Sequence, residues 1–301
     1  MNPNPGTRPA WVDDSLFPFE SHFAEIDGNV VHYVDEGSGP TLLLLHGNPT
    51  WSFLYRKMIA GLRDRFRCVA VDYPGFGLSA ASPGYGYTAA EHALVIERLV
   101  EHLDLTDITV AVQDWAGPIG VAAASRNAER YRALIIGNTW AWPKNELATR
   151  AFSFALGGPV GRQLIERFNL FARRIVPAGY RRHSLTDAEL EHYTRPFPDA
   201  AARVPTHVFP KQIMDAMPLL RETEAGLNTL SDLPALILWA TGDIAFGAGE
   251  RKRWESELPN HTTHLLEGAG HYWQDDAGEE AAREIKRWWP EGAEPGDGAA
   301  A

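Results

Sequence analysis

The segment 108–120 constrains the fold of this chain more than any other stretch. Its apolar run 108–112 ends abruptly at Gln113-Asp114-Trp115, and small residues that could begin a helix follow. A strand, one reactive side chain on a sharp turn and a closely packed helix of small residues form the layout of a nucleophile elbow. The usual elbow residue is Ser, whereas this chain has Asp114. A carboxylate at that position can displace a leaving group from carbon and form an alkyl ester that water then hydrolyses.

The rest of the chain alternates apolar runs with helical patterns, which predicts an α/β fold with a doubly wound, mostly parallel sheet. Thr88 followed by Glu91 predicts a capping box at the start of one helix. An opening hairpin is expected to turn at Gly28-Asn29. The predicted strands cover 21–27, 30–35, 41–45, 67–72, 108–113, 133–137, 235–241 and 262–266, and the predicted helices cover 51–63, 88–103, 117–127, 248–257 and 277–289.

The alternation stops after Thr139, and residues 140–227 show no buried strand. We therefore expect residues 1–139 and 228–301 to form the α/β core, with 140–227 as a helical cap inserted after the sixth strand. Within the core, 1–19 should wrap the surface, and the Gly/Ala/acidic tail 290–301 should be peripheral or disordered. The helical stretches predicted in the cap are 153–156, 161–176, 187–193 and 210–221.

Composition narrows the classes of function. The chain has 301 residues, of which 45% are hydrophobic and 22% charged, as is ordinary for a globular enzyme. A net charge of −11 argues against nucleic acid and anionic membrane surfaces as partners. The single cysteine, Cys68, lies in an apolar run and is expected to be a buried, inert thiol. Because we find no signal-peptide pattern and no apolar stretch near ~20 residues, we expect a cytoplasmic enzyme.

Three candidate catalytic residues follow predicted strands in the order nucleophile, acid, histidine, which is the order in α/β-hydrolases. They are Asp114, then Asp243 after the strand 235–241, then His271 after the strand 262–266. Each would lie at the carboxyl end of a parallel strand, where such sheets bind ligands. We expect His271 Nε2 to activate water as a general base, and Asp243 to orient the imidazole through Nδ1 and stabilise its positive form.

With these residues in view, the chain resembles the haloalkane dehalogenases of the α/β-hydrolase superfamily from about residue 20 to 289, most weakly in the predicted cap. The segments that carry the resemblance are HGNPTW at 46–51, DYPGFGLS at 72–79, QDWAGP at 113–118, GD at 242–243 and GHYWQDD at 270–276. The resemblance implies the α/β-hydrolase fold, Asp114 as nucleophile, and Asp243 as triad acid, since the sixth strand has no carboxylate at its end. Ala116 stands where the family pattern has Gly.

The resemblance also implies a halide-binding pair. Trp115 would donate its indole N–H to the leaving halide, and Asn48 its side-chain amide, while their backbone N–H groups would form an oxyanion hole. Two preset neutral donors suit a halide, which gathers negative charge as the bond breaks. The implied partners are a small apolar halogenated substrate and a halide ion, with no cofactor. The aromatic residues that could bury such a substrate are Trp140, Trp142, Phe152, Phe154, Phe168 and Phe171.

Epoxide hydrolase is the nearest alternative, because that family resembles this chain in its Asp nucleophile and His base and uses cap tyrosines to protonate the epoxide. Tyr180 and Tyr193 are available for that role. Asn48 argues for a halide, because the epoxide hydrolases have an aromatic residue there. Fluoroacetate dehalogenases place Arg near the nucleophile, where this chain has Trp115. A non-catalytic ligand-binding relative and a cofactor-free oxygenase also stay open.

Other readings of the motifs fail on sequence grounds. Ser79 lies in a loose second elbow pattern, but its strand ends too early and no helix follows it. The histidines show no metal-ligand spacing, so no metal is expected. Gly75-Phe76-Gly77 lacks the third glycine of a dinucleotide fingerprint.

Overall fold

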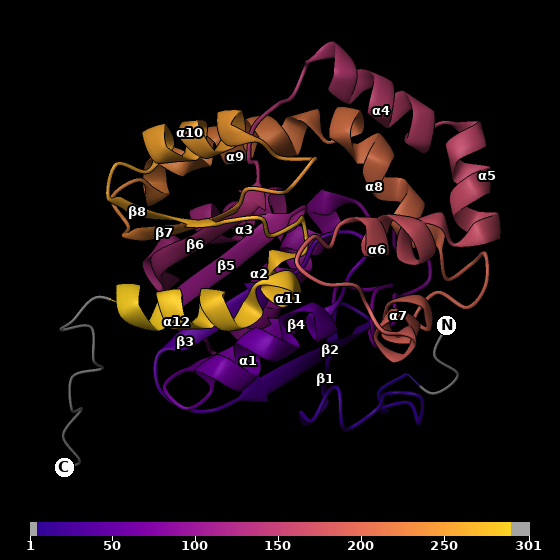
Figure 1. The fold of residues 1–301 in the computed structure, drawn as a ribbon, viewed down its shortest axis with the longest axis horizontal. Helices are drawn as coiled ribbons and strands as arrows, with labels where there is room; N and C mark the ends of the chain where they lie inside the picture. Colours follow the sequence, from indigo (N-terminus) through magenta and orange to yellow (C-terminus); the bar gives the residue numbers. More distant parts are fainter. Residues whose placement is uncertain (1–4, 290–301) are drawn as a thin grey trace.

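A computed structural model describes residues 5–289, and its centre is one eight-stranded sheet with the strand order β1-β2-β4-β3-β5-β6-β7-β8 (Figure 1). The β1–β2 and β2–β4 pairs are antiparallel, and the other pairs are parallel. This is the mostly parallel sheet that the sequence predicts. The strands are β1 (His22–Ile26), β2 (Asn29–Glu36), β3 (Thr41–Leu45), β4 (Arg67–Val71), β5 (Ile108–Asp114), β6 (Tyr131–Thr139), β7 (Ala235–Ala240) and β8 (His261–Leu266).

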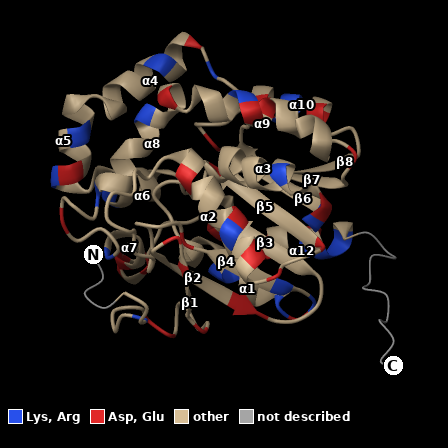
Figure 2. Ribbon diagram, turned by 180° about the vertical axis from the view of Figure 1, so that it is seen from behind, with Lys and Arg blue, Asp and Glu red and all other residues tan. Residues whose placement is uncertain are grey.

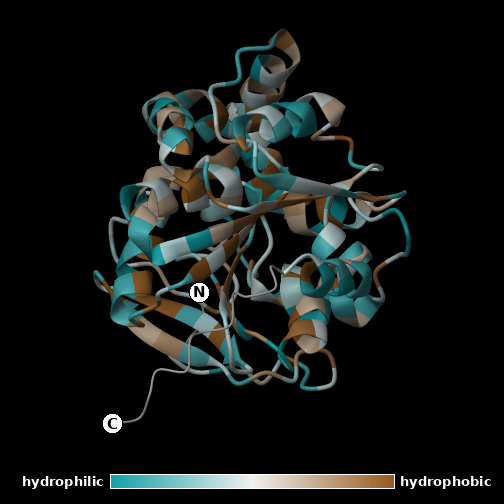
Figure 3. Cartoon of the chain, turned by 90° about the vertical axis from the view of Figure 1, so that its left-hand side faces the viewer, coloured by the Kyte–Doolittle hydropathy of each residue, from teal (hydrophilic) through white to brown (hydrophobic). Residues whose placement is uncertain are grey.

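Both faces of the sheet are covered by helices, and each face has its own hydrophobic core. Strand β3 shows the reason, because alternate side chains of a strand point to opposite faces. Leu42 and Leu44 pack in one core, and Leu43 and Leu45 pack in the other. Figure 3 shows the apolar strands enclosed by helices of mixed polarity. The helices around the sheet are α1 (Arg56–Leu62), α2 (Ala89–His102), α3 (Ala116–Arg126), α9 (Met217–Leu230), α10 (Ala248–Glu257), α11 (Trp273–Asp276) and α12 (Gly278–Trp288).

Helix α2 begins at the predicted capping box. Thr88 Oγ1 accepts a hydrogen bond from the backbone N–H of Glu91 at 3.2 Å, and Glu91 Oε2 accepts one from the backbone N–H of Thr88 at 3.0 Å. The two residues satisfy backbone donors that the first turn of a helix leaves free.

Between β6 and β7 the described chain contains helices and no strand. Figure 1 shows α4 to α8 together at the right and upper right of the view, while α9 lies against α3 of the sheet layer. The boundary of the predicted cap at residue 227 therefore stays a prediction. These elements are α4 (Leu147–Gly157), α5 (Pro159–Phe168), a π-helical turn (Phe171–Ile175), α6 (Val176–Ala178), α7 (Asp187–Thr194) and α8 (Val204–Asp215).

Two of the predicted helical stretches are wrong in extent. The stretch 161–176 is interrupted at Asn169, whose left-handed φ of 51° ends α5. The stretch 210–221 straddles the end of α8 and the start of α9, because α8 continues through Pro210 instead of beginning there. A proline inside a helix offers no N–H to the carbonyl four residues earlier.

The ends of the chain and the surface add four observations. Residues 5–19 contain no helix or strand, but Phe17 and Phe19 are buried, and Phe17 contacts Trp51 and Phe53. The predicted tail 290–301 lies outside the described residues. Figure 2 shows acidic and basic residues interspersed along the outer helices. No helix within residues 5–289 is long and apolar enough to cross a membrane.

Candidate active site

Asp114 is the last residue of β5 and has a left-handed φ of 51°, and α3 begins two residues later. Few residues other than Gly adopt this conformation without cost, although Asp does so more readily than most. The turn also needs small neighbours. A Cβ added at Gly117 would overlap Thr139 Oγ1 and the Trp140 carbonyl oxygen. The strand, sharp turn and small-residue helix predicted from the sequence are all present.

The Asp114 carboxylate accepts hydrogen bonds from the backbone of two segments, the loop after β3 and the start of α3. Its Oδ2 accepts a hydrogen bond from the backbone N–H of Asn48 at 2.9 Å, and the backbone N–H of Trp115 also bonds the carboxylate. Burial raises the pKa of Asp114 above its ordinary value, although the nearby His271 and the two N–H groups lower it. The carboxylate is therefore held by the two backbone donors that the resemblance implies for an oxyanion hole.

His271 and Asp243 complete the group of three predicted catalytic residues. His271 Nδ1 donates to Asp243 Oδ2 at 2.9 Å, and His271 Nε2 lies 3.8 Å from Asp114 Oδ1. Asp243 Oδ1 accepts the backbone N–H of Ala245 at 2.7 Å, which fixes the carboxylate. Burial lowers the pKa of His271, but the Asp243 and Asp114 carboxylates together outweigh burial and leave that pKa raised. The imidazole thus faces the Asp114 carboxylate without a direct hydrogen bond to it.

These groups line a cavity of about 630 Å³ whose walls are mostly apolar. Of the aromatic residues that the sequence offers for the pocket, Trp140, Phe152 and Phe171 line it. Phe154 and Phe168 are exposed instead, as side chains of α4 and α5. Trp142 packs on Trp254 of α10 and is not among the lining residues. The remaining apolar lining includes Ile175, Pro210, Ile213, Ile244, Phe246 and Tyr272.

Asn48 and Trp115 both line this cavity. Asn48 Nδ2 donates to the carbonyl oxygen of Thr206 at 3.3 Å. Thr206 lies four residues before Pro210, so its carbonyl oxygen is the one that the missing N–H of Pro210 leaves free in α8. An amide NH₂ has two hydrogens, so one remains for a ligand in the cavity. The hydrogen bond to Thr206 thus fixes the Asn48 side chain against α8 of the predicted cap.

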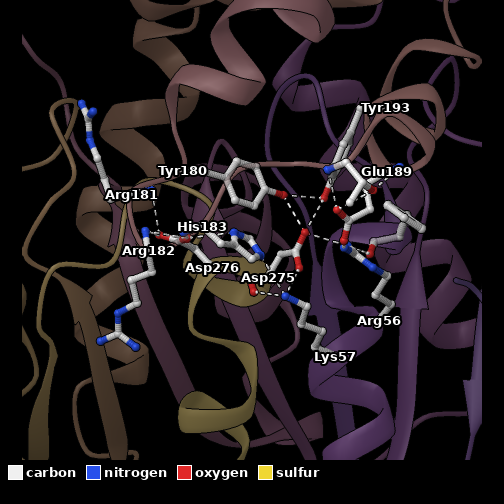
Figure 4. Close-up of polar contacts among 12 residues, drawn as sticks. Arg56, Lys57, Tyr180, Arg181, Arg182, His183, Glu189, Tyr193, Asp275 and Asp276 are labelled. Carbon is white, nitrogen blue, oxygen red and sulfur yellow. Dashed lines mark hydrogen bonds and ion pairs between the residues drawn. The ribbon is translucent and has the colours of Figure 1, made fainter.

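Tyr180 and Tyr193 lie in a buried polar network and do not line the cavity (Figure 4). Their hydroxyl groups are 2.9 Å apart, and Tyr180 Oη donates to Asp275 Oδ2 at 2.7 Å. Asp275 also pairs with Arg56 at 2.7 Å and with Lys57 at 2.9 Å. The tyrosines that would protonate an epoxide are therefore bonded to a carboxylate away from Asp114.

Gln113 belongs to the QDWAGP motif at 113–118, but the sequence alone predicts no role for it. In the structure it is fully buried, and its Nε2 lies 2.9 Å from His271 Nε2 and 3.1 Å from the His271 carbonyl oxygen. Its place directly before the elbow residue is the only local signal. The contact itself depends on a residue that follows more than a hundred positions later.

Ser79 and Cys68, which the sequence disfavours as nucleophiles, are both buried in the structure. Ser79 is buried, and its Oγ donates to the Asp72 carbonyl oxygen at 2.7 Å and accepts the backbone N–H of His32. Cys68 is buried, and burial raises the pKa of its thiol to about 12. Among residues 5–289 no group of three or more His, Cys, Asp or Glu side chains could hold a metal ion.

Comparison with known proteins gives independent evidence. The family model described as the alpha/beta hydrolase fold matches residues 40–277. Haloalkane dehalogenase 2 of Mycobacterium tuberculosis (strain ATCC 25618 / H37Rv) is 45% identical over 278 residues, which cover 91% of this chain and 96% of that protein. A cis-3-alkyl-4-alkyloxetan-2-one decarboxylase of Shewanella oneidensis is 32% identical, over 92% of this chain and 91% of that protein.

A solved structure agrees with these relatives. The crystal structure of a haloalkane dehalogenase of Agrobacterium tumefaciens C58 superposes with a TM-score of 0.83 at 25% identity, covering 92% of this chain and 98% of that one. The fold, the Asp at the elbow, and the identity over nine-tenths of the chain point the same way. This chain belongs to the α/β-hydrolase fold family and, within it, to the haloalkane dehalogenases.

Proposed function

We propose that this enzyme hydrolyses haloalkanes to an alcohol and a halide ion through an alkyl ester on Asp114, in the cytoplasm and without a cofactor. The observation that carries the proposal is the placement of the Asp114 carboxylate in an apolar cavity, with Asn48 and Trp115 beside it and His271 facing it.

In the first step, an Asp114 carboxylate oxygen attacks the carbon that bears the halogen. The carbon–halogen bond breaks, and the halide leaves with the electron pair. The Asn48 amide and the Trp115 indole N–H receive the developing negative charge. A preset donor of this kind contributes about 3 kcal/mol at the transition state. Because both donors are neutral, the halide can dissociate afterwards.

In the second step, water attacks the carboxyl carbon of the Asp114 ester while His271 Nε2 takes its proton. The oxyanion is stabilised by the backbone N–H groups of Asn48 and Trp115, which already bond the free carboxylate. Asp243 stabilises the positive imidazole. The ester bond then breaks to give the alcohol and free Asp114, and the proton of His271 passes to solvent. The sum is haloalkane and water to alcohol, halide and proton.

A panel of terminal bromo- and chloroalkanes from C3 to C6 tests the proposal, with no added cofactor. The expected result is bromide or chloride release accompanied by an equal amount of protons. A protein that opens styrene oxide but releases no bromide from any bromoalkane would instead be an epoxide hydrolase.

A second candidate is decarboxylation of a cis-3,4-dialkyl oxetan-2-one, favoured by the Shewanella relative that is 32% identical over 92% of this chain. Asp114 would open the four-membered ring at the carbon bonded to the ring oxygen, leaving an ester and a free carboxylate. Loss of CO₂ would form the alkene and release Asp114, with no water consumed. Alkene formation from such a lactone, without bromide release from the panel, would favour this candidate.

A further inference from the structure

Gln113 is fully buried, and its side-chain amide faces the imidazole of His271. Gln113 Nε2 lies 2.9 Å from His271 Nε2 and 3.1 Å from the carbonyl oxygen of the same residue. A carbonyl oxygen only accepts hydrogen bonds, so the NH₂ group of the amide must point at His271. Gln113 Oε1 has no hydrogen-bond partner within the described part of the chain. The amide is therefore oriented by its two bonds to His271.

The opposite side of the imidazole fixes which nitrogen carries the proton. His271 Nδ1 lies 2.9 Å from Asp243 Oδ2, and a carboxylate accepts, so Nδ1 is protonated. In the neutral ring Nε2 is then an acceptor, which the Gln113 NH₂ group satisfies. Gln113, His271 and Asp243 form a chain in which each hydrogen points toward Asp243.

We propose that Gln113 is a positioning residue that holds the His271 imidazole neutral, with Nε2 unprotonated beside Asp114. Protonation of Nε2 would set its N–H against the NH₂ of Gln113, so the positive ring loses a hydrogen bond that the neutral ring has. This inference rests on the proposed function, because a base that takes a proton from water must begin the step unprotonated.

The charges nearest to the imidazole act in the opposite direction. Asp243 faces it from the loop after β7, and Asp114 faces it from the end of β5. Both carboxylates favour the positive form and raise the pKa of His271, although burial lowers it. Gln113 therefore counteracts the two carboxylates, and without it the imidazole would keep its proton to a higher pH.

The other groups packed on the imidazole of His271 bring no net charge to it. Tyr272, the next residue in the chain, contacts the ring, and burial raises the pKa of its phenol well above the ordinary value, so the phenol stays neutral. Phe246 stacks on the ring at 5.8 Å. Lys144 lies 5.3 Å from the Phe246 ring and pairs with Glu250 at 2.6 Å, which balances its charge.

The reaction then requires that the hydrogen-bond donor to His271 Nε2 change from Gln113 to a water molecule. In the resting enzyme Gln113 occupies the lone pair of His271 Nε2, and the attacking water must replace it there. The second bond, to the His271 carbonyl oxygen, does not involve the lone pair, so Gln113 can stay in place while the water transfers its proton. Alkylation removes the negative charge of Asp114, which favours the neutral ring further in the ester.

The test is the pH dependence of ester decay in Gln113→Leu. The enzyme is mixed with excess 1-bromohexane and acid-quenched at intervals, and the ester fraction is read from the intact protein mass between pH 5 and 9. Losing one hydrogen bond from the neutral ring should raise the midpoint of the acid limb by about 0.7 pH unit. Decay would then be about fivefold slower below both midpoints and unchanged at pH 9.

Gln274→Leu is the matched control, because Gln274 is also fully buried and makes no hydrogen bond to His271 among the described residues. Its midpoint should equal that of the wild type. A Gln113→Leu midpoint that is unchanged or lower would overturn the inference, since a packing role alone would not move it. Failure of the proposed function looks different, because the wild type itself would then release no bromide.

A second measurement covers the case in which Gln113→Leu does not fold. The ¹⁵N chemical shifts of the His271 imidazole in the wild type at pH 8 report the protonation of each nitrogen. A protonated Nδ1 with an unprotonated Nε2 supports the inference. A ring that is protonated on both nitrogens at that pH, or on Nε2 alone, would overturn it.

Discussion

Asn48 and Trp115 are two neutral hydrogen-bond donors, and their proposed role is to stabilise the negative charge that the halide gains as the carbon–halogen bond breaks. Asn48→Ala and Trp115→Leu should each slow bromide formation by about 100-fold or more, because a preset donor is worth about 3 kcal/mol at the transition state. Single-turnover bromide release with 1-bromobutane measures this step directly.

Trp142→Leu is the control for the loss of a buried indole. Trp142 is as buried as Trp115, but it packs on Trp254 and does not line the cavity. Its rate of bromide formation should stay within a few-fold of the wild type. A near-normal rate for Trp115→Leu would refute the halide-binding assignment.

At the residue scale, the sequence predicts what short motifs and strand ends encode. Asp114, Asp243 and His271 each follow a strand, so their meeting at one edge follows from the order of parallel strands. The Gln113–His271 contact and the isolation of Tyr180 from the cavity could not be predicted. Both depend on side-chain partners that are remote in sequence.

At the scale of elements, the elbow depends on a close approach between α3 and the end of β6. Gly117→Ala would set a methyl group on Thr139 Oγ1 and the Trp140 carbonyl oxygen. Overpacking of this kind costs about 1–3 kcal/mol. We expect a lower free energy of unfolding in urea together with slower bromide formation, because α3 must shift relative to Asp114.

Gly249→Ala is the control for that change, since nothing lies within 4 Å of an added Cβ in α10. It should leave activity unchanged and raise stability by up to about 1 kcal/mol, because Ala has a higher helix propensity than Gly. If the two variants were equally stable and equally active, the close approach at Gly117 would not matter.

The sheet elements were predictable, whereas the extents of two of the four helical stretches in the cap were not, for a physical reason. A continuous apolar run such as 41–45 identifies a strand buried on both faces, and the strands found lie within two residues of those predicted. In the predicted cap, Asn169 turns left-handed and Pro210 stays inside a helix. Those two backbone features depend on tertiary contacts, such as the bond from Asn48 to the Thr206 carbonyl oxygen.

At the scale of the whole molecule, buried neutral histidines make stability depend on pH. Burial lowers the pKa of His46 to about 4 and that of His92 to about 3. The unfolded chain binds these protons near pH 6.5, so the stabilising contribution is complete above that pH and is lost as the pH falls toward the folded values. When the pH falls from 7 to 5, each of these two histidines should lower the free energy of unfolding by about 2 kcal/mol.

His92→Gln removes one of these groups while keeping a polar side chain near the hydroxyl of Tyr85, which lies 3.0 Å from His92 Nδ1. Urea unfolding at pH 7 and pH 5 should show that the variant loses about 2 kcal/mol less than the wild type on acidification. An identical loss in both proteins would mean that His92 does not set the acid sensitivity.

The central claim is the covalent ester on Asp114, and His271→Phe tests it most directly because alkylation does not need the base. After incubation with 1-bromobutane, the intact mass of this variant should rise by one butyl group, peptide mapping should place the group on Asp114, and one equivalent of bromide should be released. An unchanged mass under conditions in which the wild type turns over, or a butyl group on any other residue, would contradict the account.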